Sequence, residues 1–215
     1  MIVGFAFLVV VVIVSVGRVA DRDDGILGLD AQRADEPLPE FAVPVASGQL
    51  EGDANVFQDD CDSDRLPCPA GARRTPACDV EGADVIRVCD FFDRPLVLSF
   101  WFTRGGDDCT DQQDVVSEVS RRYRGRVGFL SLNVRDDRGS VRDLVRERGW
   151  RMAVGYDRDG AVANIYRIGG CPTLVYAYPG GILESTGIGE LGPGGLSRRV
   201  DSLLTATLRK QRTAR

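Results

Sequence analysis

The sequence predicts an α/β domain built on a mixed central β-sheet with helices on both faces. Two continuous apolar runs, residues 95–102 and 127–134, are rich in β-branched and aromatic side chains, which is typical of strands buried on both faces. Residues 110–124 between them carry apolar side chains at helical spacing. Two buried strands joined by a helix form a βαβ unit, so we expect them to pair in parallel.

A hairpin nearer the C-terminus makes the predicted sheet mixed. Residues 173–178 and 182–188 have strand character, and Pro179-Gly180-Gly181 lies between them as a tight turn. Strands joined by so short a turn pair in antiparallel fashion. The remaining elements are expected as a short strand over residues 152–156 and helices over residues 140–149, 160–168 and 196–208.

The first residues of the chain predict a transmembrane helix. Residues 1–17 carry no charged side chain, and residues 2–16 are almost entirely Val, Ile, Phe and Leu. A helix of that length rises roughly 26 Å, slightly less than the ~30 Å hydrocarbon core of a bilayer. A cleaved signal peptide is the alternative. We therefore expect an anchor or signal segment over residues 1–19, an acidic linker over 20–37, the folded domain over 38–208 and a basic tail over 209–215.

Two features point to opposite sides of the membrane. Arg18 and Arg22 follow the apolar segment and no basic residue precedes it, which favours a cytoplasmic domain. The chain also has 6 cysteines with no metal-binding arrangement, which favours an oxidising compartment. We give the cysteines more weight and expect a monomer anchored on the extracytoplasmic side of a membrane.

Composition excludes several classes of function. The chain has no histidine, which rules out a Ser-His-Asp triad, a Cys-His nucleophile pair and histidine-ligated zinc or haem. No two cysteines have the close spacing of a zinc site, so we expect neither a metal nor another cofactor. The net charge of -5 makes nucleic acid a poor partner.

The order of elements resembles the thioredoxin-like superfamily. Asp157-Arg-Asp-Gly160, before a short helix, resembles a segment of the membrane-anchored thioredoxins of the TlpA and ResA type. Gly170-Cys171-Pro172-Thr173 resembles the cis-proline loop of the superfamily, and Pro39-Glu-Phe41 resembles the first strand of the same group and of peroxiredoxins. The resemblance covers roughly residues 38–208 and implies a thioredoxin fold.

The sequence departs from that superfamily at the active site. The Cys-x-x-Cys motif would fall on Gly106-Asp107-Asp108-Cys109, so a glycine stands where the attacking cysteine is usual. Peroxiredoxins of the AhpC/TSA type carry Thr-x-x-Cys there, nine residues after a strand phenylalanine, and the spacing from Phe100 to Cys109 matches. Gly106, however, also replaces the peroxidatic threonine.

Cys109 is expected at the start of a helix. The free N–H groups and the dipole at a helix N-terminus lower the pKa of a cysteine. Asp108 has the side chain of an N-cap, but Asp107 and Asp108 place like charge beside a thiolate and oppose its formation. Arg104 either offsets these carboxylates or binds an acidic group, unless it is an ordinary solvent-exposed arginine.

The resemblance implies that Cys171, which precedes Pro172, faces Cys109 across the active-site turn. A reversible pair would make the chain a membrane-tethered thiol–disulfide oxidoreductase acting on protein thiols and disulfides. A permanent bond would instead leave a redox-inactive binding module. In a third interpretation the chain is a peroxiredoxin-type thiol peroxidase that reduces peroxide, with Cys109 as the peroxidatic and Cys171 as the resolving cysteine. In a fourth, the two cysteines are inert buried thiols.

The other four cysteines are expected to have structural roles. Cys78 and Cys89 flank a predicted turn, and Cys61 and Cys68 could close a small loop. Six cysteines allow 15 connectivities, so this pairing is a hypothesis.

Overall fold

The computed structural model of the chain describes residues 34–50 and 75–213. The predicted anchor over residues 1–19, most of the acidic linker, and Cys61 and Cys68 lie outside the described residues. Among the helices described, none is long and apolar enough to cross a bilayer. The elements are β1 (Ala42–Pro44), η2 (Ala77–Asp79), β2 (Val85–Arg87), η3 (Val88–Phe91), β3 (Leu96–Trp101), η4 (Thr103–Gly105), α2 (Asp107–Arg122), β4 (Gly128–Val134), α3 (Arg138–Glu147), β5 (Ala153–Asp157), α4 (Ala161–Ile165), β6 (Thr173–Tyr178), β7 (Ile182–Ile188) and α5 (Pro193–Thr213).

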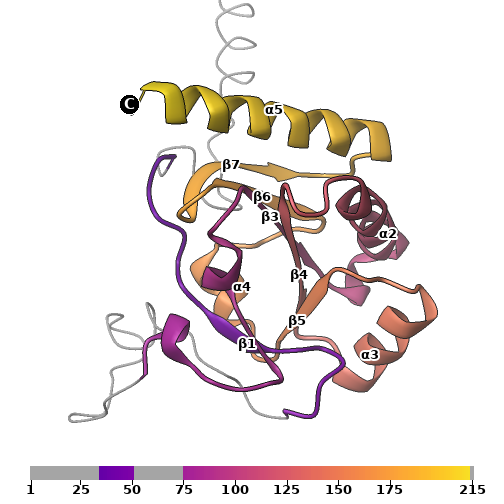
Figure 1. Ribbon diagram of the computed structural model, residues 1–215. Helices are drawn as coiled ribbons and strands as arrows, with labels where there is room; N and C mark the ends of the chain where they lie inside the picture. The colour runs from indigo at the N-terminus through magenta and orange to yellow at the C-terminus, as the bar shows by residue number, and fades with distance from the viewer. Residues whose placement is uncertain (1–33, 51–74, 214–215) are drawn as a thin grey trace, which may run out of the picture.

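The central sheet has five strands in the order β5-β4-β3-β6-β7 (Figure 1). β3 pairs in parallel with β4, and β4 with β5, as the two helical crossovers require. β6 runs antiparallel to both β3 and β7. The mixed sheet predicted from the sequence is therefore confirmed, including the βαβ unit and the C-terminal hairpin.

Helices cover both faces of this sheet. On one face, Val97 and Tyr176 pack with apolar residues of α2 and α5, such as Val119 and Leu203. On the same face, α3 packs against the β5 edge of the sheet through Val141. On the other face, α4 and residues 38–45 around β1 pack against the sheet in a cluster that includes Leu98, Leu130, Phe41, Tyr166 and Val162. β3, between the two layers, is buried along its whole length.

The Asp-x-x-Gly segment has a clear structural role. The carboxylate of Asp157 accepts hydrogen bonds from the backbone N–H groups of Val162 and Ala163, at 3.3 and 2.8 Å. These are N–H groups of the first turn of α4 that the helix itself leaves unpaired. Gly160 has φ +84°, and a Cβ there would lie 2.6 Å from the side chain of Arg135. The segment therefore caps α4 and turns the chain into it.

The folded region is slightly longer than predicted. The N–H of Asp35 donates to Leu183 O at 2.9 Å, so residues before the predicted start at 38 already contact β7. At the other end, α5 continues to Thr213 and includes most of the predicted basic tail. The segment Pro39-Glu-Phe41 leads directly into β1 (Ala42–Pro44), which pairs with β2 in a separate two-stranded sheet.

Candidate functional site

Cys109 and Cys171 form a disulfide at the carboxyl end of β3. Cys109 is in the first turn of α2, and Cys171 directly precedes Pro172. Their Cα atoms are 5.6 Å apart although 62 positions separate them in the sequence. The Cys171–Pro172 peptide bond is cis, which confirms the cis-proline loop. Cys109 is 1% exposed, whereas Cys171 is partly exposed, so the two residues differ in their access to solvent.

The start of α2 differs from the prediction. The N-cap is Gly106, and α2 begins at Asp107, so the expected N-cap role of Asp108 is wrong. Gly106 has φ +91° and ψ 176°, a conformation that a residue with a Cβ rarely adopts. This turn therefore disfavours a cysteine at the position where thioredoxins carry the attacking one. Asp107 and Asp108 remain exposed in the first turn, beside Cys109.

A buried carboxylate that the sequence reasoning missed holds the loop before α2. Asp136, which follows β4, accepts hydrogen bonds from the N–H of Thr103 at 2.6 Å and from Asn133 Nδ2 at 2.7 Å. Arg104 pairs with the same carboxylate, Nε to Oδ1, at 3.5 Å, and its Nη2 donates to Arg135 O at 2.9 Å. Its side chain is still 69% exposed. Arg104 therefore contacts Asp136 and not the aspartates beside Cys109.

A second set of polar contacts fixes α2 on the sheet. Gln113, fully buried on α2, donates from Nε2 to Ser99 Oγ at 2.9 Å. Its Oε1 accepts from Ser131 Oγ at 2.9 Å. Ser99 and Ser131 are paired in register on β3 and β4. One amide thus bridges two strands, and a serine inside each apolar strand is the sequence signal that would have revealed it.

The loop after β7 joins the cis-proline loop to α2. The N–H of Gly189 donates to Pro172 O at 3.0 Å. Two residues on, the N–H of Leu191 donates to Oε1 of the buried Gln112 at 2.7 Å. Behind the disulfide, Trp101 is fully buried in a cluster against which Cys171 packs. The site is thus supported from the sheet, from α2 and from the loop after β7.

The exposed rim of the disulfide is acidic. Glu190, on the loop after β7, lies close to Asp108. The negative charge of Asp108 raises the pKa of Glu190 above its ordinary value, with smaller contributions from lost hydration, from a hydrogen bond to Asp108 and from the charge of Asp111. Arg148 binds Asp111 and Asp114 at 3.1 and 2.5 Å. Arg148 is therefore paired with two other carboxylates of α2.

The second described disulfide joins Cys78 in η2 to Cys89 in η3, as predicted, with Cα atoms 5.8 Å apart. The carboxylate of Glu40 lies within 4.8 Å of both sulfurs. Because these sulfurs are bonded to each other, they offer no thiolate ligands in this state. The bond connects two short helical turns that lie between β1 and β3 in the chain. The predicted bond between Cys61 and Cys68 falls outside the described residues.

Comparison with solved structures gives the fold a name. A thiol:disulfide interchange protein of the thioredoxin family from Chlorobium tepidum is 14% identical, with TM-score 0.56, and the match covers 82% of this chain and 99% of that one. A DsbF homologue from Corynebacterium diphtheriae is 17% identical, with TM-score 0.55 and coverage of 82% and 91%. A secreted disulfide oxidoreductase of Mycobacterium tuberculosis is 21% identical, with TM-score 0.50 and coverage of 55% and 88%.

The chain therefore has the thioredoxin fold, as the order of its elements predicts. Neither the known protein-family profiles nor the curated protein sequences match this chain. At these levels of identity the likeness establishes the architecture alone.

The buried amide bridge predicts a coupled loss of stability. Gln113→Leu leaves the hydroxyls of Ser99 and Ser131 without their amide partner, so we expect the free energy of unfolding to fall by about 2–4 kcal/mol. The measurement is urea unfolding of the oxidised protein. The control is the triple variant Gln113→Leu, Ser99→Ala, Ser131→Ala. It also removes the two hydroxyls that have lost their hydrogen-bond partner, so it should be more stable than Gln113→Leu alone. The bridge would be contradicted if the loss of unfolding free energy in the triple variant equalled the sum of the losses caused by the three substitutions made separately.

The acidic rim predicts a shifted titration. Asp108→Asn removes the main charge that raises the pKa of Glu190, so this pKa should fall toward its ordinary value. Because folding raises this pKa, the folded state holds the proton more tightly than the unfolded state. The associated stability is complete below the unfolded pKa and is lost as pH rises through the folded value. An NMR titration of the Glu190 carboxyl carbon tests the shift. Asp111→Asn is the control, and an equal or larger effect there would refute the assignment.

Proposed function

We propose that this protein is a thiol–disulfide oxidoreductase that exchanges its Cys109–Cys171 disulfide with protein thiols. The observation that carries the proposal is the position of this disulfide, between the first turn of α2 and the residue before a cis-proline. A disulfide whose cysteines differ in exposure suits exchange, because one sulfur accepts the incoming thiolate while the other leaves. The solved structures described above include a disulfide oxidoreductase and a thiol:disulfide interchange protein, which supports the assignment.

The exposures of the two cysteines favour one direction of attack. Cys171 is partly exposed and Cys109 is 1% exposed, so a substrate thiolate reaches Cys171 Sγ first. The new bond joins the substrate sulfur to Cys171, and the bond to Cys109 breaks, leaving a Cys109 thiolate. A second substrate thiolate then attacks the substrate sulfur of this mixed disulfide and releases Cys171. The substrate leaves as a disulfide and the protein as a dithiol.

The surroundings of Cys109 affect it as a leaving group in opposite ways. Its place in the first turn of α2 stabilises a thiolate through free N–H groups and the helix dipole. Asp107 and Asp108 oppose that charge, but both are exposed, and solvent weakens their effect. In this mechanism Cys109 takes the part of the buried second cysteine of Cys-x-x-Cys. Cys171 takes the part of the missing first one, at Gly106.

A trapping experiment tests the direction of attack. Cys109→Ser removes the sulfur that could displace a bound substrate from Cys171. The Cys171 thiolate of this variant should therefore attack oxidised glutathione, release one glutathione thiol and keep the other half as a mixed disulfide that accumulates. In Cys171→Ser the remaining thiol is buried, and the adduct should form at least about tenfold more slowly. Mass spectrometry of the adducts under non-reducing conditions gives both rates. Equal rates for the two variants would contradict the proposed roles.

The wild-type protein and the Cys109→Ser variant also distinguish the proposed oxidoreductase from the two alternative functions. With mild reductant, the wild-type Cys109–Cys171 bond should open before the Cys78–Cys89 bond, because a structural disulfide resists reduction by thiols. If Cys109–Cys171 is the more resistant bond, the chain is a binding module with structural disulfides. Rapid consumption of peroxide that disappears in Cys109→Ser would instead indicate a peroxiredoxin-type peroxidase.

The proposal also places the domain outside the cytoplasm, tethered to a membrane. It rests on the apolar segment over residues 2–16 and on the two described disulfides, which persist in oxidising compartments. We expect the full chain to stay in the membrane fraction after an alkaline carbonate wash. After reduction of intact cells, its thiols should react with a membrane-impermeant maleimide. Release by the wash would indicate a cleaved signal segment, and protection from the reagent would indicate a cytoplasmic domain.

A further inference from the structure

A pocket lies at the end of the sheet opposite the disulfide. It is formed where β3, β4 and β5 begin, whereas Cys109 and Cys171 lie beyond the carboxyl end of β3. Its wall includes Arg94 before β3, the last turns of α2, Gly125 in the loop to β4, and Arg151 before β5. The cavity volume is about 260 Å³, just below the usual range for small-molecule sites, so it suits a small ligand.

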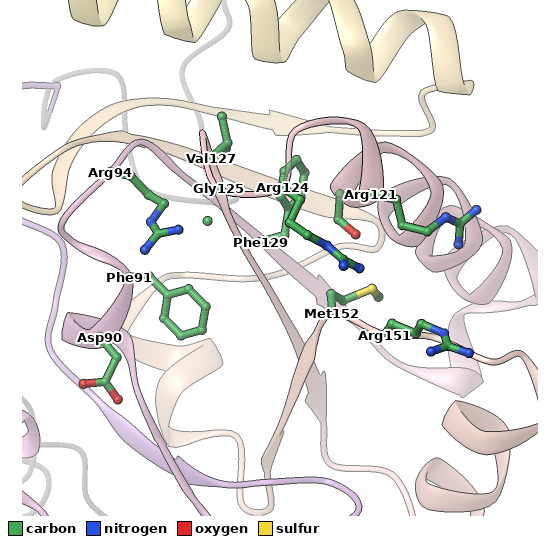
Figure 2. A pocket seen from close by; sticks show the side chains of 12 residues that line it. Asp90, Phe91, Arg94, Arg121, Arg124, Gly125, Val127, Phe129, Arg151 and Met152 are labelled. Atoms are coloured by element: carbon green, nitrogen blue, oxygen red, sulfur yellow. The ribbon is translucent and has the colours of Figure 1, made fainter.

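Arginines dominate the charge of this pocket. Four line it, and Figure 2 shows Arg121, Arg124 and Arg151 on the side of Met152, with Arg94 on the opposite side beside Phe91. The lining contains a single carboxylate, that of Asp90, which is bonded to Arg87 outside the pocket. The protein as a whole has a net charge of -5, so this concentration of positive charge does not reflect its overall composition.

Three of these arginines have no counter-ion within the part of the chain that is described. Arg94 pairs with its neighbour Asp93 at 2.6 Å. Arg121, Arg124 and Arg151 make no ion pair with any described carboxylate. All three are exposed, so their donors are accessible from solvent. Guanidinium groups held around one pocket repel each other until an anion binds between them.

The floor of the pocket is apolar. Phe91, Val127, Phe129 and Met152 line it, and Phe129 is only 6% exposed. An apolar floor below charged donors suits a ligand that has both an anionic group and an apolar body. A single carboxylate needs only one arginine fork, whereas a phosphate offers several oxygens and up to two charges to three guanidinium groups. Three arginines without a counter-ion among the described residues therefore favour a phosphate over a carboxylate.

We propose that this pocket binds a phosphate-bearing ligand with an aromatic or aliphatic body. Arg121, Arg124 and Arg151 hold the phosphate, and the floor around Phe129 and Met152 receives the apolar part. Such a phosphate occurs in a soluble phosphomonoester or in an anionic lipid. This site is separate from the Cys109–Cys171 disulfide, so it does not depend on the redox function proposed above.

The test uses the full chain in non-ionic detergent and phenyl phosphate as the probe. Isothermal calorimetry should show saturable binding at least about tenfold tighter than that of inorganic phosphate, because only phenyl phosphate fills the apolar floor. The double variant Arg124→Gln, Arg151→Gln should weaken phenyl phosphate binding by about tenfold or more. The matched control is Arg198→Gln, Arg212→Gln, which removes the same charge from exposed positions on α5 and should stay within about twofold.

Hydrogen exchange distinguishes the two sources of phosphate. In nanodiscs, protection of backbone amides in residues 120–129 by anionic phosphatidylglycerol, relative to phosphatidylcholine, identifies a lipid phosphate. Protection by phenyl phosphate alone identifies a soluble ligand. No saturable binding of phenyl phosphate below about 10 mM, or equal weakening in the α5 control, overturns the proposal. Disulfide exchange at Cys171 should be unchanged in the pocket variant, so failure of one proposal leaves the other standing.

Discussion

The hydrogen bonds of one buried amide fix the geometry of the whole site. Gln113 joins α2 to Ser99 on β3 and to Ser131 on β4, between strands that are largely apolar. Burying a polar group in such surroundings costs free energy unless the group is hydrogen-bonded. Only one position of α2 on the sheet pairs all three side chains. This position of α2 places Cys109 opposite the cis-proline loop, within bonding distance of Cys171. The bond from Leu191 to Gln112 holds the neighbouring loop to the same helix.

In the proposed function, the two cysteines of the exchanging disulfide are placed differently from those of the thioredoxin-like Cys-x-x-Cys motif. The turn before α2 requires a positive φ at Gly106, where the superfamily has its exposed cysteine. The partly exposed cysteine is instead Cys171, on the far side of the turn, and the buried cysteine stays on α2. Because disulfide exchange needs one accessible sulfur and one leaving group, the proposed exchange is compatible with this placement.

The molecule separates its charges along the strands of the sheet. Acidic side chains, among them Asp108 and Glu190, surround the disulfide beyond the carboxyl end of β3. Arginines surround the pocket at the amino ends of β3, β4 and β5. Loops at the two ends of a sheet vary independently of its core, so one scaffold can present two surfaces of opposite charge. The acidic rim favours approach by basic protein segments, and the arginine pocket favours anions.

The sequence by itself determined the layers and connections of the fold, because runs of buried apolar residues, a helical stripe and a Gly-Gly turn are local patterns. The pairing of Cys109 with Cys171 was predictable only through a resemblance to thioredoxins, since 62 positions separate them. The tertiary structure alone decided the roles of Asp136 and Gln113, the N-cap at Gly106 and the grouping of arginines around one pocket. The contacts of Asp136 and Gln113 and the arginine pocket depend on segments that strand register and helix packing bring together, so their partners are not set by local sequence.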